Sequence, residues 1–350
     1  MQLTLLRSTA EFQALADEWN QLLEKSASHV PFLRHEYLLA WWQTLGGGEW
    51  ANSTQPKAQL CLVTGRHPDG SLAGIAPLFF TANRDGEPAL MLLGSIEISD
   101  YLDLIVAPDD LDTFIAALLD FLDSPDLPDW SVLDCYNLLE SSPTLAALQA
   151  ASEKRGWTYQ PEKLQHCPAI PLADDWESYL AGIDKKQRHE IRRKMRRIEG
   201  PEHGVRWYIV ENPAQLTDEI EAFFDLMAYD PEKKSFLTPE MRTQLRLAAQ
   251  AAYNAGWLQM AFIEIDGEKA AGYLNFDYAN KIWVYNSGIN FDLGALSPGW
   301  VLLGYLIQWA IEHGRDSFDF MRGDEDYKYR FGGIDRRIVR ASLRRQLATP

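Results

Sequence analysis

The order of hydrophobic and polar positions in the first half of the chain predicts alternating strands and helices. Residues 58–64 are predicted to form a strand, Pro68-Asp69-Gly70 a tight turn, and residues 71–80 an apolar returning strand, which together make a hairpin. Three further strands are expected at 89–94, 101–106 and 130–136. Before the last of these, apolar residues recur at helical spacing, namely at Leu111, Ile115, Leu118, Leu119 and Leu122.

The second half repeats this order. A strand is predicted at 256–265, a turn at Asp266-Gly267, and further strands at 270–278 and 281–288. A helix over 299–313 and a strand at 317–321 follow. Each half also opens with large apolar residues at helical spacing: Phe12, Leu15, Trp19 and Leu22 in the first, and Leu216, Ile220, Phe223 and Leu226 in the second.

Matching landmarks in the two halves indicate a tandem duplication of one α/β unit. The Asp-Gly turns end at Gly70 and Gly267, which are 197 positions apart, and the strand residues Asp134 and Asp319 are 185 apart. Few residues are identical between the halves, so the interpretation depends on element order, and chance recurrence of a common α/β order is the alternative. We predict two tandem units, each a mixed sheet flanked by helices, over residues 1–165 and 166–350.

Composition supports a folded chain of about two domains. The 350 residues, of which 46% are hydrophobic and 12% aromatic, suffice for two separate cores and exclude collagen-like and fully disordered classes. The formal net charge of −17 repels polyanions, so DNA binding is not expected. A phosphate-bearing ligand would need a local basic region or free backbone amides.

The cysteines and the apolar stretches favour a cytoplasmic protein. Only Cys61, Cys135 and Cys167 occur, without a C-x-x-C pair, which argues against a disulfide framework and a zinc ribbon. Residues 1–9 lack the pattern of a signal peptide. The longest apolar stretches are shorter than the roughly 18 residues that span a bilayer, so no membrane span is predicted.

Metal and nucleophile motifs are missing from the sequence. The seven histidines are scattered without H-E-x-x-H or paired spacing, so no metal site is expected. G-x-S-x-G and Walker motifs do not occur. His166 and Cys167 point to opposite faces of a predicted strand, which makes Cys167 a core residue rather than a nucleophile.

One basic segment interrupts the acidic chain at 184–199, where eight lysines and arginines stand against three acids. An apolar stripe predicts an amphipathic helix docked on the protein; it consists of Leu180, Ile183, Ile191, Met195 and Ile198. Along its edge run Lys185, Arg188, Arg192 and Arg196. These cations either bind an anionic ligand or form a solvated face with local Glu/Arg pairs.

Two later segments carry candidate chemistry. Ser297 or Pro298 can cap the helix predicted at 299–313, and Gly299 lets a ligand approach its first amides, although Ser-Pro-Gly is also common turn chemistry. The polar run at 318–333 follows a strand, where sites often form in α/β folds, with a solvated loop as the alternative. In this run Tyr327 is a candidate proton donor, and Lys328 or Arg322 a candidate anion ligand.

These segments, in this order, give the chain a resemblance to a known family. The residues that carry it are the basic segment from Lys185, then 296–299, then Phe318-Asp319-Phe320 with Arg322-Gly323 and Tyr327-Lys328, and in the first half 32–42 and 98–101. The chain resembles CelD/BcsL-like proteins with a BioF2-like acetyltransferase domain of the GNAT superfamily, which are related to FemAB peptidyltransferases. The resemblance covers nearly the whole chain.

The resemblance implies two GNAT-like halves, with an acyl-CoA donor such as acetyl-CoA in the C-terminal one. The pantetheine arm would lie along strand 283–288 and the pyrophosphate at the next helix. The implied donor-binding residues are Tyr285, Ser287, Ser297, Gly299, Trp300 and Lys328. The chain lacks the usual Gln/Arg-x-x-Gly-x-Gly/Ala phosphate loop and has Leu296-Ser-Pro-Gly-Trp300 in its place.

The implied reaction is N-acyl transfer, in which an amine attacks a thioester and Tyr327 or water protonates the thiolate. Asp100 and Asp319 are candidates for receiving the amine proton, and Asp103 for orienting the acceptor. Arg188, Arg192 and Arg322 are candidates for binding an anionic acceptor, such as a saccharide or cell-envelope precursor.

Two alternatives stay open at this point. A FemAB-like enzyme would take its donor from aminoacyl-tRNA; the net charge disfavours this, but the basic helix offers a local track. A non-catalytic scaffold in polysaccharide biosynthesis would keep the fold with a degenerate donor site.

Overall fold

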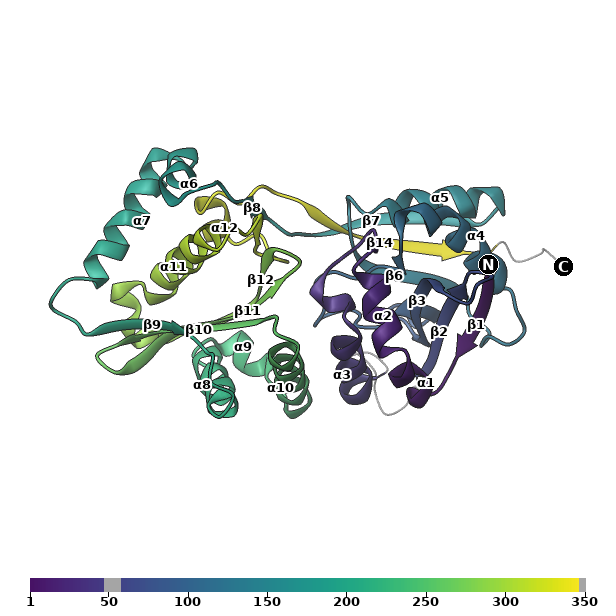
Figure 1. Cartoon of the computed structure of the whole chain (residues 1–350), viewed down its shortest axis with the longest axis horizontal. Helices are drawn as coiled ribbons and strands as arrows, with labels where there is room; N and C mark the ends of the chain where they lie inside the picture. The colour runs from purple at the N-terminus through teal and green to yellow at the C-terminus, as the bar shows by residue number, and fades with distance from the viewer. Residues whose placement is uncertain (47–57, 346–350) are drawn as a thin grey trace. The chain divides into compact units, whose positions relative to one another are not determined.

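The computed structural model describes residues 1–46 and 58–345, which form two compact units (Figure 1). Unit 1 comprises Met1–Gln165 and Arg337–Pro350, and unit 2 comprises His166–Arg336. Each unit is a mixed sheet flanked by helices, which confirms the predicted fold class.

The sheet of unit 1 has the strand order β1-β2-β3-β4-β6-β14-β7, with β5 paired to β3. Its strands are β1 (Gln2–Leu6), β2 (Gln59–Arg66), β3 (Leu72–Ala82), β4 (Pro88–Leu92), β5 (Ile105–Val106), β6 (Val132–Leu139), β7 (Thr158–His166) and β14 (Arg337–Arg344). Its helices are α1 (Thr9–Ala14), α2 (Ala16–Leu23), α3 (His35–Leu45), α4 (Leu111–Phe121) and α5 (Pro143–Lys154).

The sheet of unit 2 has the order β8-β13-β12-β11-β10-β9. Its strands are β8 (Ala169–Pro171), β9 (Val205–Ile209), β10 (Leu258–Ile265), β11 (Glu268–Tyr278), β12 (Lys281–Ile289) and β13 (Ser317–Asp319). Helices α8 (Leu216–Met227), α9 (Pro231–Phe236) and α10 (Pro239–Asn254) lie on one face, and α6 (Trp176–Gly182), α7 (Lys185–Ile198) and α11 (Pro298–Glu312) on the other (Figure 1). The short helix α12 (Asp326–Arg330) follows β13.

The two sheets share one pairing pattern over six strands, which supports the tandem arrangement. In unit 1 the first four strands pair antiparallel, β4 pairs parallel with β6, and β6 antiparallel with β14. In unit 2 the strands β9 to β12 pair antiparallel, β12 pairs parallel with β13, and β13 antiparallel with β8. Asp134 and Asp319, matched in the sequence, occupy equivalent positions in the parallel pairs, opposite Met91 and Trp283.

The structure differs from the predicted elements in three places. Strand β14 belongs to the sheet of unit 1, although residues 166–350 were assigned to the second half. The expected strand at 101–106 contains only Ile105–Val106. The apolar stripe that began at Leu180 is divided between α6 and α7, because the Asp184 side chain caps α7 by accepting from the amides of Lys186 and Gln187.

The cores are built from the predicted apolar faces. In unit 2, Ile191, Met195 and Ile198 of α7 are buried together with the apolar residues of α11. All three cysteines are buried and none forms a disulfide. Within residues 1–46 and 58–345, helices long and apolar enough to cross a membrane do not occur.

Candidate functional site

The two parallel strands at the centre of unit 2 pair over a short distance and then separate. Strand β12 pairs with β13 only from Lys281 opposite Ser317 to Trp283 opposite Asp319, where β13 ends. Strand β12 continues to Ile289 and carries a bulge, because Leu274 and Asn275 of β11 pair with Asn286 and Val284 and leave Tyr285 as the extra residue. The continuation of β12 therefore has backbone groups that β13 does not pair.

A cavity of about 320 Å³ lies beside this free part of β12. Aromatic and aliphatic side chains form most of its wall, and hydroxyls and one ammonium group add polar atoms. The lining residues are Lys194, Tyr273, Ser287, Ile289, Gly294, Ser297, Pro298, Gly299, Trp300, Leu303 and Tyr327. The structure thus brings together five residues predicted from the sequence: Ser287, Ser297, Gly299, Trp300 and Tyr327.

The first turn of α11 lies in the cavity wall with unpaired amides. Ser297 is the N-cap residue, with φ of 56°, and its side chain makes no capping hydrogen bond, contrary to the expected cap. Pro298 has no amide hydrogen, and the helix offers no acceptor to the amides of Gly299 and Trp300. Such a helix end binds anions through its amides and its dipole.

Gly299 lies close to the side chain of Ile289 at the end of β12. A Cβ atom at this position would lie 2.6 Å from Cδ1 of Ile289. The Tyr273 hydroxyl donates to the Gly299 carbonyl at 3.3 Å, which fixes the start of α11 against β11. The amide end of the helix therefore has a defined position beside the cavity.

Tyr327 presents its phenol to the cavity from α12. Its ring packs edge-on against Phe320, with 5.9 Å between ring centroids. Burial, with Tyr273 and Glu325 nearby, raises the pKa of Tyr327 well above its ordinary value. The phenol consequently stays protonated at neutral pH, as a hydrogen-bond donor to a leaving group must.

Lys194 is a cavity residue that the sequence did not single out. Its ammonium lies 4.0 Å from the centre of the Trp300 ring and 3.5 Å from Glu190. Burial lowers its pKa. The contact between Lys194 and Trp300 joins α7 to α11. In the sequence, the one signal for Lys194 is its position next to Met195, a residue of the buried apolar stripe.

Tyr273 is a second cavity residue that the sequence did not single out. The alternation of apolar residues in β11 indicates only that Tyr273 belongs to the core.

Lys328, predicted to bind the donor, is not among the residues that line the cavity. Its ammonium group is bonded to residues of its own loop. Its side chain is 3% exposed, and Nζ donates to the carbonyls of Arg322 and Gly323 at 2.6 and 3.2 Å. The Glu325 carboxylate is 2.9 Å away. These three acceptors match the three hydrogens of an ammonium group, so the side chain holds the loop after β13.

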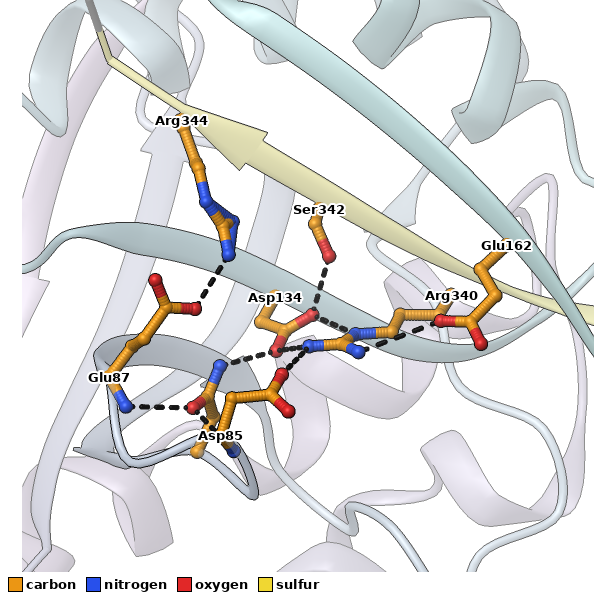
Figure 2. A network of polar contacts seen from close by, with 8 residues as sticks. Asp85, Glu87, Asp134, Glu162, Arg340, Ser342 and Arg344 are labelled. Atoms are coloured by element: carbon orange, nitrogen blue, oxygen red, sulfur yellow. Dashed lines mark hydrogen bonds and ion pairs between the residues drawn. The ribbon is translucent and has the colours of Figure 1, made fainter.

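Asp319 is buried in an ion pair. Oδ2 accepts from Arg336 at 2.6 Å, and Oδ1 accepts from the amide of Met321 at 2.8 Å. Its counterpart in unit 1, Asp134, is also fully buried and bonded to an arginine, Arg340. Figure 2 shows Asp134 within this network, where it also accepts from Ser342 at 2.9 Å. The equivalent arrangement favours a structural role for both aspartates.

Asp100 and Asp103 belong to unit 1, whereas the other predicted site residues belong to unit 2. Asp103 is buried and accepts hydrogen bonds from the hydroxyls of Ser28 and Ser142 and from the amide of Leu104. Burial raises the pKa of Asp103. Asp100 is 8% exposed. Both aspartates are therefore part of the interior of unit 1.

The remaining predicted residues of unit 2 are not among those that line the cavity. Arg188 donates to the Leu180 carbonyl at 3.4 Å, and Arg192 is paired with Glu177. Tyr285 stacks on Phe276 with 5.1 Å between ring centroids. Arg322 supplies the carbonyl that Lys328 binds. The exposed cations of α7 are Lys185, Lys186, Arg193, Arg196 and Arg197.

The equivalent opening in unit 1 is filled by the chain itself. After β4, residues 93–96 and 98–106 are all buried. Asn137 of β6 donates to the carbonyls of Ile96 and Ser99, both at 2.8 Å, which fastens this segment beside β6. Asp109 and Asp110 precede α4, where they disfavour an anionic ligand. The cavity in unit 2 has no such plug.

No group of three or more His, Cys, Asp or Glu side chains within 1–46 and 58–345 is arranged to hold a metal ion.

The part of the chain that contains the cavity matches a known protein family. Residues 185–329, which include every residue of the cavity wall, match the family model described as the acetyltransferase (GNAT) domain. No curated protein matches the chain.

Solved structures share the fold across the whole chain. FemX has a TM-score of 0.62 at 11% identity, with 97% of each chain covered. A conserved protein of unknown function from Bacteroides thetaiotaomicron VPI-5482 has the same score and identity, with 97% of this chain and 100% of that chain covered. L-PGS from Bacillus licheniformis has a TM-score of 0.55 at 13% identity, with coverages of 95% and 93%. At these identities the similarity shows that the chain shares the fold of these structures.

Proposed function

We propose that the protein is an N-acyltransferase that transfers an acyl group from acyl-CoA to an amine acceptor, with the donor in the cavity of unit 2. One observation carries the proposal. The part of β12 that β13 does not pair and the uncapped start of α11 line the same cavity. The α11 amides suit the donor's pyrophosphate, and the aromatic wall suits its pantetheine arm and acyl group.

The chemistry follows from these positions. A backbone amide of β12 beyond Trp283, where β13 no longer pairs with the strand, is proposed to stabilise the oxyanion that forms when the amine attacks the thioester carbonyl. The carbon–sulfur bond then breaks, and the Tyr327 phenol donates its proton to the sulfur and regains one from the attacking nitrogen. Holding donor and acceptor side by side supplies much of the rate.

Turnover tests the proposal directly. The purified protein is incubated with acetyl-CoA and longer acyl-CoAs and a panel of amines, amino sugars and peptides, while a thiol reagent follows release of free CoA. We expect release that depends on both substrates. Donor binding without transfer to any amine would instead favour the scaffold function.

Replacement of Tyr327 by Phe should slow transfer by about 10²-fold, because it removes the proton donor but keeps the ring that packs on Phe320. The affinity for acyl-CoA should not change. Tyr329→Phe is the matched control, since its hydroxyl, on the same helix, faces Asp335. Equal rates in the two variants, measured at saturating donor, would remove Tyr327 from the reaction.

The acceptor is proposed to be anionic, a saccharide or cell-envelope precursor. This assignment is supported by the cations of α7, which include Arg188 and Arg192, and by Arg322 in the polar loop. Their positive charges attract an anionic acceptor. The motifs at 185–193, 296–299 and 318–328 support the CelD/BcsL-like, BioF2-like assignment. The three free cysteines support a cytoplasmic location. Asp100, expected to receive the amine proton, and Asp103, expected to orient the acceptor, lie in the interior of unit 1, and both are now proposed to be structural, as is Asp319.

Aminoacyl-tRNA is the alternative donor. The exposed basic face of α7 favours it, as Lys194 of the same helix lines the cavity, and FemX and L-PGS share the fold. Salt-dependent association with tRNA, together with no binding of CoA esters, would replace the CoA-dependent proposal by this one.

A further inference from the structure

A second, smaller pocket adjoins the cavity on the other side of β12. It has a volume of about 50 Å³, and its wall consists of Leu226, Met227, Asp230, Lys233, Ser287, Gly288, Ile289 and Phe291. Ser287 and Ile289 line both pockets, so the two meet at the free part of β12. Gly288 allows this, since a Cβ there would lie 2.6 Å from the Met227 amide nitrogen at the end of α8.

Lys233 places its side-chain nitrogen at this junction. Nζ donates to the carbonyl oxygen of Ser287 at 2.5 Å and is 3.3 Å from the Ser287 hydroxyl. Among the residues that the structure describes, no carboxylate lies within ion-pair distance of Nζ. Asp230, at the start of α9, uses its Oδ1 to cap the helix by accepting from the amides of Glu232 and Lys233.

Comparison with Lys328 shows what this environment favours. Lys328 has three acceptors, one of them a carboxylate, as an ammonium group requires. Lys233 has two partners, both on one serine, which match the two hydrogens of a neutral amine and leave its lone pair free. The charged groups that act on Lys233 are Asp230, Glu325 and Lys328, and burial is the largest effect, lowering its pKa.

We infer that the smaller pocket receives the acceptor amine and that Lys233 is the general base that takes the amine's proton. This inference rests on the proposed function. The acceptor ammonium gives one proton to the Lys233 amine, which later returns it to solvent. The freed amine forms the new bond to the carbonyl carbon, the carbon–sulfur bond breaks, and the nitrogen's second proton passes to the thiolate through Tyr327. The exposed ring of Phe291, 55% accessible, forms an apolar edge of this pocket.

The first test is an NMR titration of full-length protein with ¹³C-labelled lysines, in which Lys233→Arg assigns the Lys233 signal. We expect Lys233 to titrate at lower pH than Lys234, the exposed lysine that follows it on α9, because burial lowers the pKa of Lys233. A midpoint equal to or above that of Lys234 would overturn the inference, because the surroundings of Lys233 would then not favour its neutral amine.

The second test uses acetyl-CoA with an amine that supports turnover. Lys233→Met should lower kcat/KM by about 10²-fold and leave the Kd for acetyl-CoA unchanged, with Lys234→Met as the control. Lys233→Arg should not restore the rate, since a guanidinium stays charged; rescue by Arg would mean that the residue acts only through its bonds to Ser287. Failure of wild-type protein to bind any CoA ester would refute the proposed function instead. If no amine is accepted, the titration alone decides.

Discussion

Gly299→Asp should weaken the affinity for acyl-CoA by at least about 100-fold. The new carboxylate would stand beside the free amides of the first turn of α11, where the donor's pyrophosphate is proposed to bind. A charge repulsion of a few kcal/mol at a partly desolvated site corresponds to such a factor. Titration calorimetry with acetyl-CoA measures the effect, and thermal unfolding shows that the variant is folded.

Gly299→Asn separates charge from size. Both variants add a side chain of equal volume where a Cβ would press on Ile289, 2.6 Å away, so both pay the same steric penalty. We expect Asn to reduce affinity far less than Asp. Equal losses would mean that the side chain only blocks the cavity and that the helix start does not bind an anion.

Asp134→Ala should lower the free energy of unfolding by about 3 kcal/mol, near the lower end of the cost of breaking a buried ion pair. Asp134 is fully buried and accepts from Arg340 at 2.7 and 2.8 Å, from Asn83 at 2.9 Å and from Ser342 at 2.9 Å. Its loss would remove a buried acceptor that Arg340, Asn83 and Ser342 share and would leave Arg340 with its partners Asp85 and Glu162 (Figure 2). Denaturant unfolding of the full chain measures the change.

Asp85→Ala is the matched control for this network. Asp85 also binds Arg340, at 2.9 Å, but its side chain is 57% exposed. An exposed pair contributes at most about 1 kcal/mol, so we expect a small loss. Equal destabilisation by the two variants would contradict a structural role for the buried aspartate at this strand position, and with it the role now assigned to Asp319.

Local patterns in the sequence were enough to predict the parts that depend on near neighbours. The Asp-Gly hairpins, the strand at 281–288 and the helix at 299–313 have clear periodicity and turn residues, and the structure contains β12 and α11 at these places. The cluster of Ser287, Ser297, Gly299, Trp300 and Tyr327 was predicted through the family resemblance, and all five line one cavity.

Features that depend on distant pairing could not be predicted. Strand β14 pairs with β6 across about two hundred residues, and its own pattern does not reveal that partner. The segment at 101–106 is buried and therefore as apolar as a strand, but only Ile105–Val106 pair as one. The contact of Lys233 with Ser287 joins α9 to β12, and Lys233 lies in a charged run that looks solvent-exposed from sequence alone.

The most direct measurement is calorimetric titration of the wild-type chain with acetyl-CoA to determine the number of sites. The parallel strand pairs of the two units are equivalent, but in unit 1 the buried residues 93–96 and 98–106 follow β4. In unit 2 a cavity brings the free end of β12 together with the uncapped start of α11. We expect one donor bound per chain. Binding of two donors would contradict the assignment of the site to unit 2, and the absence of binding by any CoA ester would contradict the CoA-dependent function itself.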